Sequence, residues 1–149
     1  MINVEVPTYI TGILDFDNGA VGTLFTTFDV HYPTQSRFEI YGSEGTLLVP
    51  DPNGFGGPVF LLRRGESSFK EMPLLFDYPE NSRGLGLADM AKALTSGRTF
   101  RADCQQTYHV LDVMTAFERS SISGCREAIM SPFEKKEPMV YPPVKGILD

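Results

Sequence analysis

The first seventy residues alternate apolar with polar side chains, at the two-residue period of a β-strand. Turn residues separate the alternating runs, and Asp17-Asn18-Gly19 is a hairpin signal because these residues tolerate positive φ. The pattern therefore predicts strands joined by short turns. The predicted strands span 9–16, 20–31, 36–42, 46–49, 59–63 and 68–72.

The predicted strands have two unlike faces. One face is apolar and carries residues such as Ile10, Leu14 and Leu24. The other face mixes polar with aromatic side chains, a composition suited to a homodimer contact, to a carbohydrate-contacting wall, or to both. Its expected interface residues are Phe25, Thr27, Arg37, Glu39 and Tyr41.

After residue 80 the apolar period changes to that of a helix. Ser82 is the expected cap of a first helix that Gly97 ends, and Asp103 is the expected cap of a second that Gly124 ends. Four prolines in residues 125–149 favour an extended tail, with one short strand possible at 139–141. Strands followed by helices predict an α+β fold: a mostly antiparallel open sheet with helices packed on one face.

Composition narrows the class of protein. A chain of 149 residues fits one domain, and no composition shift marks a boundary within residues 1–149. The net charge of −6 argues against a nucleic-acid partner. No apolar run approaches the ~18 residues of a membrane span, and the N-terminus does not resemble a signal peptide. We therefore expect a soluble, cytoplasmic protein with no membrane partner.

Few residues suggest chemistry. Asp29 and His31 would share one face of a strand, where the carboxylate could orient the imidazole as a proton acceptor; a polar pair on a sheet surface is the simpler interpretation. The loop 78–84 combines an aromatic ring, an amide, a hydroxyl and a guanidinium, which suit the hydroxyls and C–H face of a sugar. A capped loop with a solvated Arg83 is the alternative. The histidines and cysteines lack metal-ligand spacing.

A dinucleotide fingerprint is not present in the sequence. Such a motif needs G-x-G-x-x-G between a strand and a helix, so that the pyrophosphate meets the helix N-terminus. Gly84-Leu85-Gly86 lacks the third glycine and a fitting strand before it. We therefore expect no cofactor-binding residues and no metal site in this chain.

Five segments form an ordered set along the chain: 6–12 (VPTYITG), 15–23 (DFDNGAVGT), 39–46 (EIYGSEGT), 78–90 (YPENSRGLGLADM) and 96–98 (SGR). In their order and spacing they resemble the C-terminal domain of the Gfo/Idh/MocA oxidoreductases. The resemblance extends from about residue 4 to 124. It implies an open sheet with helices on one side, dimerisation through the exposed sheet face, and a sugar, inositol or related polyol substrate.

The resemblance also implies NAD or NADP, bound by a separate Rossmann domain. The family's glycine fingerprint, its Glu-Lys-Pro lysine and its Asp-x-x-x-His segment precede the matched region and are missing here. We therefore expect a substrate-facing, dimerising domain that is inactive alone and supplies no catalytic residue. The expected substrate-binding residues are His31, Tyr78, Asn81 and Arg83.

Two other functions remain open from the sequence. One is a stand-alone α+β small-molecule cyclase or isomerase that uses Asp29 and His31 as an acid–base pair. The other is a non-catalytic carbohydrate-binding module.

Overall fold

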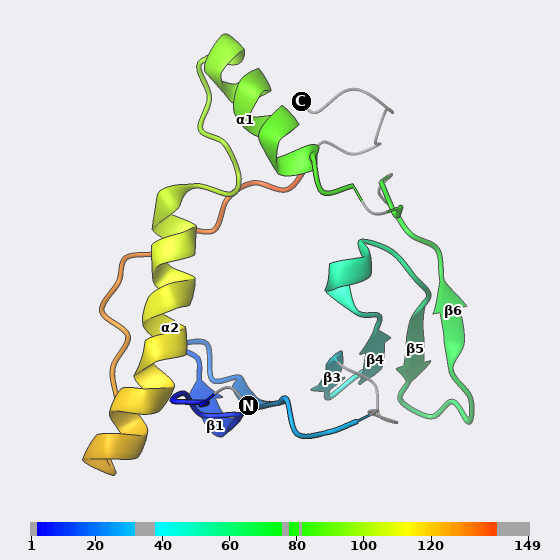
Figure 1. The fold of residues 1–149 in the computed structure, drawn as a ribbon. Coiled ribbons are helices and arrows are strands. Elements are labelled where there is room, and N and C mark those ends of the chain that lie inside the picture. Colours follow the sequence, from blue (N-terminus) through cyan, green and yellow to red (C-terminus); the bar gives the residue numbers. More distant parts are fainter. Residues whose placement is uncertain (1–2, 32–37, 76–77, 81, 140–149) are drawn as a thin grey trace. The chain divides into compact units, whose positions relative to one another are not determined.

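The computed structural model describes residues 3–31, 38–75, 78–80 and 82–139. Within the described residues, six strands precede two α-helices (Figure 1). This order and the antiparallel pairing confirm the predicted α+β class. The elements are β1 (Tyr9–Asp15), β2 (Val21–Thr27), β3 (Phe38–Gly42), β4 (Gly45–Val49), the 3₁₀ helix η1 (Pro52–Gly54), β5 (Val59–Arg63), β6 (Lys70–Met72), α1 (Leu85–Ser96) and α2 (Cys104–Ser123).

The described strands hydrogen-bond as two sheets rather than as the single sheet that alternation suggested. One sheet pairs β1 with β2, and the other has the order β3-β4-β5-β6. Each neighbouring pair is antiparallel. Alternation reports which side of a strand is apolar, but it does not report which strands pair.

The β1–β2 hairpin forms where the sequence predicts it. Its register pairs Tyr9 with Thr27 and Asp15 with Val21. Gly19 adopts a φ of +85°, and the Asn18 side chain accepts a hydrogen bond of 3.0 Å from the amide of Ala20. The local chemistry of the turn is therefore sufficient to set this register.

The predicted helix limits agree with the structure, except for the capping residue of α1. α1 ends at Gly97, whose φ is +74°, and α2 begins directly after Asp103 and ends before Gly124, whose φ is +66°. The prediction that Ser82 caps α1 is wrong, because Gly84 is the N-cap. The Ser82 hydroxyl instead donates to the carbonyl of Glu80 at 2.7 Å and so closes the loop before the helix.

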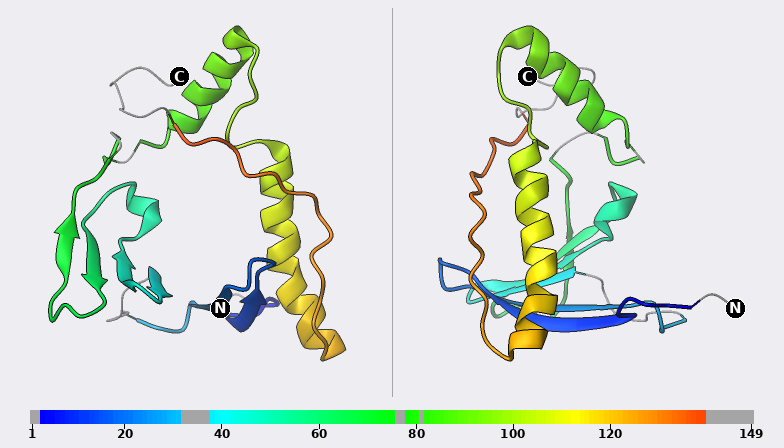
Figure 2. Two further views of the ribbon diagram at one scale, coloured as in Figure 1. Left: turned by 180° about the vertical axis from the view of Figure 1, so that it is seen from behind. Right: turned by 60° about the vertical axis from the view of Figure 1, so that its left-hand side comes forward.

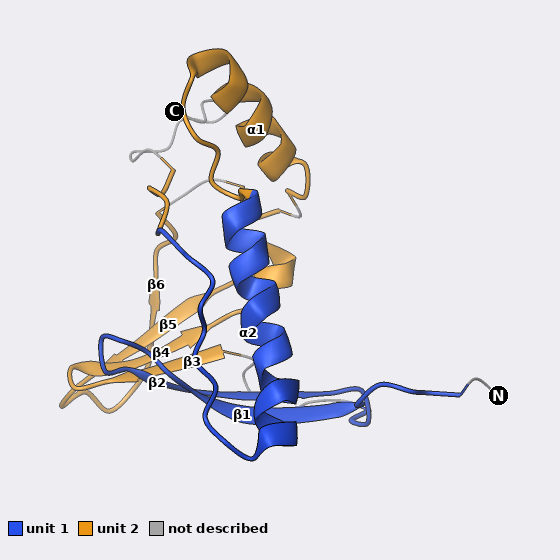
Figure 3. Ribbon diagram, turned by 90° about the vertical axis from the view of Figure 1, so that its left-hand side faces the viewer, with its two compact units in different colours: residues 1–34, 104–134 blue, residues 35–103, 135–149 orange. Residues whose placement is uncertain are grey.

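The chain packs as two compact units, each discontinuous in sequence (Figure 3). Unit 1 comprises residues 1–34 and 104–134, and therefore holds β1, β2 and α2. Unit 2 comprises residues 35–103 and 135–149, and holds β3–β6 and α1. The tail after α2 contributes to both units.

In unit 1, α2 packs on β1 at a glycine. A Cβ placed on Gly12 would lie 2.5 Å from the ring of Phe117, so the missing side chain makes room for that ring. Residues 125–134 of the tail run beside α2 without helix or strand, as predicted for a proline-containing segment (Figure 2), whereas most of the possible strand at 139–141 lies outside the described residues. The Asp112 carboxylate on α2 accepts a hydrogen bond of 3.2 Å from the Ser131 amide of the tail.

In unit 2, α1 buries a carboxylate. Asp89 accepts hydrogen bonds from the guanidinium of Arg98, from the backbone amide of Arg101 at 2.8 Å, and from the Arg101 guanidinium. Arg101 also donates to the carbonyls of Glu137 and Pro138 in the tail, at 3.1 and 3.2 Å. These charge-assisted hydrogen bonds connect α1, the segment after it and the tail.

Candidate functional site

Two loops of unit 2, residues 50–57 and 78–84, touch at a glycine. A Cβ on Gly56 would lie 2.2 Å from the carbonyl oxygen of Pro79 and 2.8 Å from its Cβ. Only a residue without a side chain fits this close approach. The contact therefore fixes the loop before α1 against the loop that contains η1.

Both loops contain strained backbone. Among the described residues, the non-glycine residues with positive φ are Phe55, at +65°, and Tyr78, at +74°. For a bulky side chain this conformation is costly and persists only where the surroundings hold it. Residues held in this way concentrate at ligand-binding sites, so the two outliers support a functional interpretation of these loops.

Arg83 joins the two loops through its side chain. Its Nη2 donates a hydrogen bond of 3.0 Å to the amide oxygen of Asn53, and its Cζ lies 5.6 Å from the ring centroid of Phe55. The carboxylate of Asp51 accepts from the Asn53 backbone amide at 3.0 Å, which fixes the loop that carries the acceptor. The guanidinium is exposed yet held from two directions, unlike the solvated arginine of the simpler interpretation.

The grouping of the predicted substrate-binding residues stays a prediction. Tyr78 is half-buried in the same loop as Arg83, while Asn81 lies outside the described residues. His31 belongs to unit 1 and Arg83 to unit 2, so their grouping stays a prediction.

The strand argument for Asp29 and His31 is wrong, because β2 ends at Thr27. Asp29 lies beyond it, where its carboxylate accepts a hydrogen bond of 2.8 Å from the Thr8 hydroxyl and its amide donates to the Thr27 hydroxyl. The strand-based reason for an acid–base pair is therefore lost, and with it the support for the cyclase or isomerase alternative.

Four of the five expected interface residues are described, and Arg37 lies outside the described residues. Phe25 is 58% exposed and packs edge-on against Tyr9, with ring centroids 5.2 Å apart. Tyr41 is 74% exposed, and its hydroxyl donates to the Glu39 carboxylate. This hydrogen bond raises the pKa of Tyr41, because loss of the proton would place two negative charges together.

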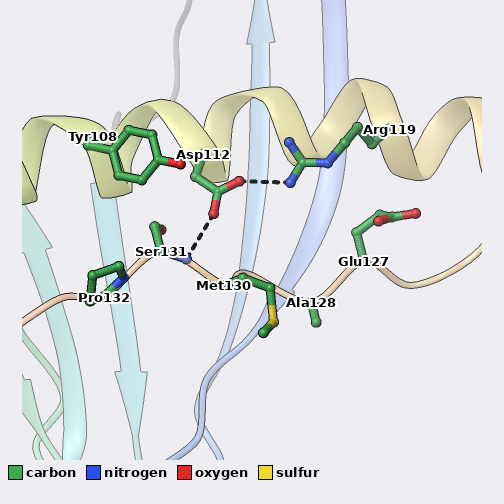
Figure 4. Close-up of a pocket in the computed structure, with 8 residues that line it drawn as sticks. All are labelled: Tyr108, Asp112, Arg119, Glu127, Ala128, Met130, Ser131 and Pro132. Atoms are coloured by element: carbon green, nitrogen blue, oxygen red, sulfur yellow. Dashed lines mark hydrogen bonds and ion pairs between the residues drawn. The ribbon is translucent and has the colours of Figure 1, made fainter.

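A pocket of about 400 Å³ lies between α2 and the tail in unit 1, and sequence reasoning missed it (Figure 4). Asp112 is central to it, accepting from Arg119 at 2.8 Å and from the Ser131 amide. The hydrogen bond from Arg119 lowers the pKa of Asp112. The lining residues are Tyr108, Asp112, Arg119, Glu127, Ala128, Met130, Ser131 and Pro132.

The sequence offered a signal only for the helical half of this pocket. Asp112 and Arg119 are two helical turns apart and so lie on one face of α2. The position of the tail, which contributes Ser131, follows no periodic pattern. His109, beside this pocket, lies 2.9 Å from the Ser131 hydroxyl and stacks on Phe133, which gives it a packing role.

The described residues do not form the strand–helix unit of a dinucleotide fingerprint, and the expected absence of a cofactor site stays a prediction. The described neighbouring strands pair antiparallel, whereas the pyrophosphate fingerprint belongs to a parallel strand–helix–strand unit. Gly84 and Gly86 enter α1 from a loop rather than from a strand. Among the described residues, no group of three or more His, Cys, Asp or Glu side chains is arranged to hold a metal ion, and no helix is long and apolar enough to cross a bilayer.

Comparison with known families adds one finding. Residues 2–48 match the family model of the GFO/IDH/MocA C-terminal domain. The matched segment contains β1, β2, β3 and most of β4. No curated protein and no solved structure matches the chain. The resemblance stated from the sequence is therefore confirmed over this segment, and from residue 49 to 124 it stays a prediction.

Proposed function

We propose that this chain, whose residues 2–48 match the model of the GFO/IDH/MocA C-terminal domain, is the substrate-facing and dimerising part of an NAD(P)-dependent sugar or polyol oxidoreductase. The family match is the observation that carries this proposal. The residues that hold the nucleotide and move the hydride and proton belong to a Rossmann domain outside this sequence. We expect the chain alone to be inactive, because its sequence lacks the glycine fingerprint that would bind the pyrophosphate.

The loops around Arg83 support the substrate-facing role. Sugar-binding sites need hydrogen-bond donors held in fixed positions, since each donor that must be ordered on binding costs conformational entropy. Asn53 and Phe55 hold the Arg83 guanidinium before any ligand arrives. Tyr78 supplies an aromatic ring from the same loop, and His31 is included as a further candidate from unit 1.

The exposed aromatic side chains support the dimerising role. Phe25 and Tyr41 are both mostly exposed, and tyrosine and phenylalanine are enriched in the buried cores of protein interfaces. A specific dimer usually buries roughly 1,200–2,000 Å². We propose that Phe25 on β2 of unit 1 and Tyr41 on β3 of unit 2 each contribute to this area.

The proposal is tested by Arg83→Ala in the two-domain enzyme, made by joining this chain to its Rossmann domain. A lost hydrogen bond to a charged group costs about 1.5–3 kcal/mol, so kcat/KM for the polyol should fall roughly 10- to 150-fold. Arg64→Ala is the matched control, since it removes an exposed arginine of the same unit from the turn after β5. The control should change kcat/KM less than threefold.

His31→Ala is measured beside Arg83→Ala. If both substitutions leave kcat/KM unaltered, the proposed site is in the wrong place. If only His31→Ala is silent, the site is confined to the loops of unit 2.

A further inference from the structure

We propose that the Arg83 site selects an acidic sugar or polyol, one that carries a carboxylate or phosphate group. This inference rests on the proposed function, in which the loops around Arg83 face the substrate. It goes further by naming the chemical group that Arg83 recognises.

The first argument is the pairing of charges. Arg98 and Arg101 pair with the Asp89 carboxylate, and Arg119 pairs with the Asp112 carboxylate. Arg83 differs, because its partners among the described residues are the neutral amide of Asn53 and the ring of Phe55. Its positive charge is thus held in place without being neutralised, on a chain whose net charge is −6.

The second argument is the geometry of the guanidinium. This group is planar and has five N–H donors in a rigid fork that matches the two oxygens of a carboxylate or phosphate. Asn53 accepts from Nη2, and the Arg83 Cζ lies over the ring of Phe55. The hydrogen bond to Asn53 leaves further N–H donors for a ligand, and the group stays exposed.

The third argument is the identity of residue 53. A carboxylate at this position would hold Arg83 as firmly as the amide does, but it would also cancel the charge. The Asn53 amide orients the Arg83 guanidinium and leaves the positive charge of the guanidinium available to a ligand. A hydroxyl of a neutral polyol accepts one hydrogen bond from the guanidinium, whereas an oxyanion adds its own charge and a second acceptor oxygen for a bidentate pair.

The test is calorimetric titration of the whole chain at low ionic strength. The probes are D-glucuronate, D-glucose 6-phosphate, neutral D-glucose and inorganic phosphate. We expect at least one of the two acidic sugars to bind tenfold or more tightly than glucose, and which one binds identifies the anion as carboxylate or phosphate. Raising the salt to about 0.2 M should weaken the binding of the acidic sugar, because salt screens exposed charges.

Three variants separate the effect of the Arg83 charge from the effect of the orientation of its side chain. Arg83→Gln should lower the affinity for the acidic sugar to that for glucose, whereas Arg64→Gln should leave it unchanged. Asn53→Ala keeps the charge but removes the acceptor that orients Arg83, so we expect an intermediate loss of about three- to tenfold. Arg83 is exposed, and far-UV circular dichroism of each variant shows whether the fold is retained.

Each contrary outcome overturns a definite statement. If glucose binds as tightly as the acidic sugars and Arg83→Gln weakens all of them equally, the sugar site stands and the selection of an anion is refuted. If inorganic phosphate binds as tightly as glucose 6-phosphate, the ligand class is a simple anion and not a sugar. If Arg83→Gln changes no affinity, or no sugar binds, both the anion and the site around Arg83 are refuted.

Discussion

The contact between Gly56 and Pro79 makes a sharp prediction, because both positions belong to the proposed site. Gly56→Ala adds one methyl group. That carbon would lie 2.2 Å from the Pro79 carbonyl oxygen, whereas ordinary contacts begin near 3.4 Å. The two loops must therefore separate by about 1.2 Å, and the obstacle is backbone, which cannot rotate away as a flexible side chain would.

The cost of the added methyl group follows from this displacement. Overpacking a well-packed site typically costs 1–3 kcal/mol, and a backbone clash of this depth belongs near the middle or top of that range. We expect a loss of about 2 kcal/mol in the free energy of unfolding. For a chain of this size, that loss corresponds to a fall in Tm of roughly 4–8 °C.

The same displacement should damage the site. Separating the loops moves Asn53 and Phe55 on one loop away from Arg83 on the other. A misplacement of about 1 Å can lower activity by on the order of a hundredfold. We therefore expect Gly56→Ala to reduce kcat/KM at least tenfold in the two-domain enzyme.

The assay pairs thermal unfolding with steady-state kinetics, and Gly54→Ala is the control. Gly54 lies on the same loop, yet a Cβ there would meet nothing within 4 Å. The free energy of unfolding of the Gly54→Ala variant should stay within about 0.5 kcal/mol of that of the parent chain. If Gly56→Ala and Gly54→Ala behave alike, the loops do not meet as described and the reasoning about Arg83 fails with them.

Two other predictions concern the buried carboxylate and the exposed aromatic face. Burial raises the pKa of Asp89, but the hydrogen bonds from Arg101 and Arg98 outweigh it and hold the pKa below its ordinary value. Asp89→Asn should therefore lower the free energy of unfolding by about 2 kcal/mol at pH 7. This value is smaller than that of a fully buried ion pair, because water screens the two partly exposed guanidinium groups. In urea unfolding, the gap between the parent chain and this variant should be full above pH ~4 and close as the pH falls through the folded pKa; a gap independent of pH contradicts this assignment. Phe25→Glu should shift a dimer toward monomer in sedimentation at tens of micromolar, and a parent chain already monomeric there contradicts the interface.

The sequence by itself determined the elements whose signals are local. Alternation and the Asp17-Asn18-Gly19 turn predicted the β1–β2 hairpin, because the turn residues set the register of the strands beside them. The limits of α2 followed from Asp103 before it and Gly124 after it, since a helix start and a positive-φ stop involve only a few neighbouring residues.

Two predictions from local sequence signals were wrong: the capping residue of α1 and the end of β2. Ser82 is a favourable capping residue, but the chain places Gly84 at the cap and uses the serine hydroxyl to close the preceding loop. The alternation around Asp29 continued past the point where β2 ends, because a hydrophobic pattern does not report where strand pairing stops.

Only the tertiary structure decided the candidate site. Arg83 and its acceptor Asn53 are thirty positions apart, and no periodicity relates a loop before a helix to a 3₁₀ turn. The burial of Asp89 has the same origin, since a carboxylate leaves water only where folding brings arginine side chains to pair with it. Local preferences thus set the elements, whereas the contact of Arg83 with Asn53 depends on packing between segments that no short segment encodes.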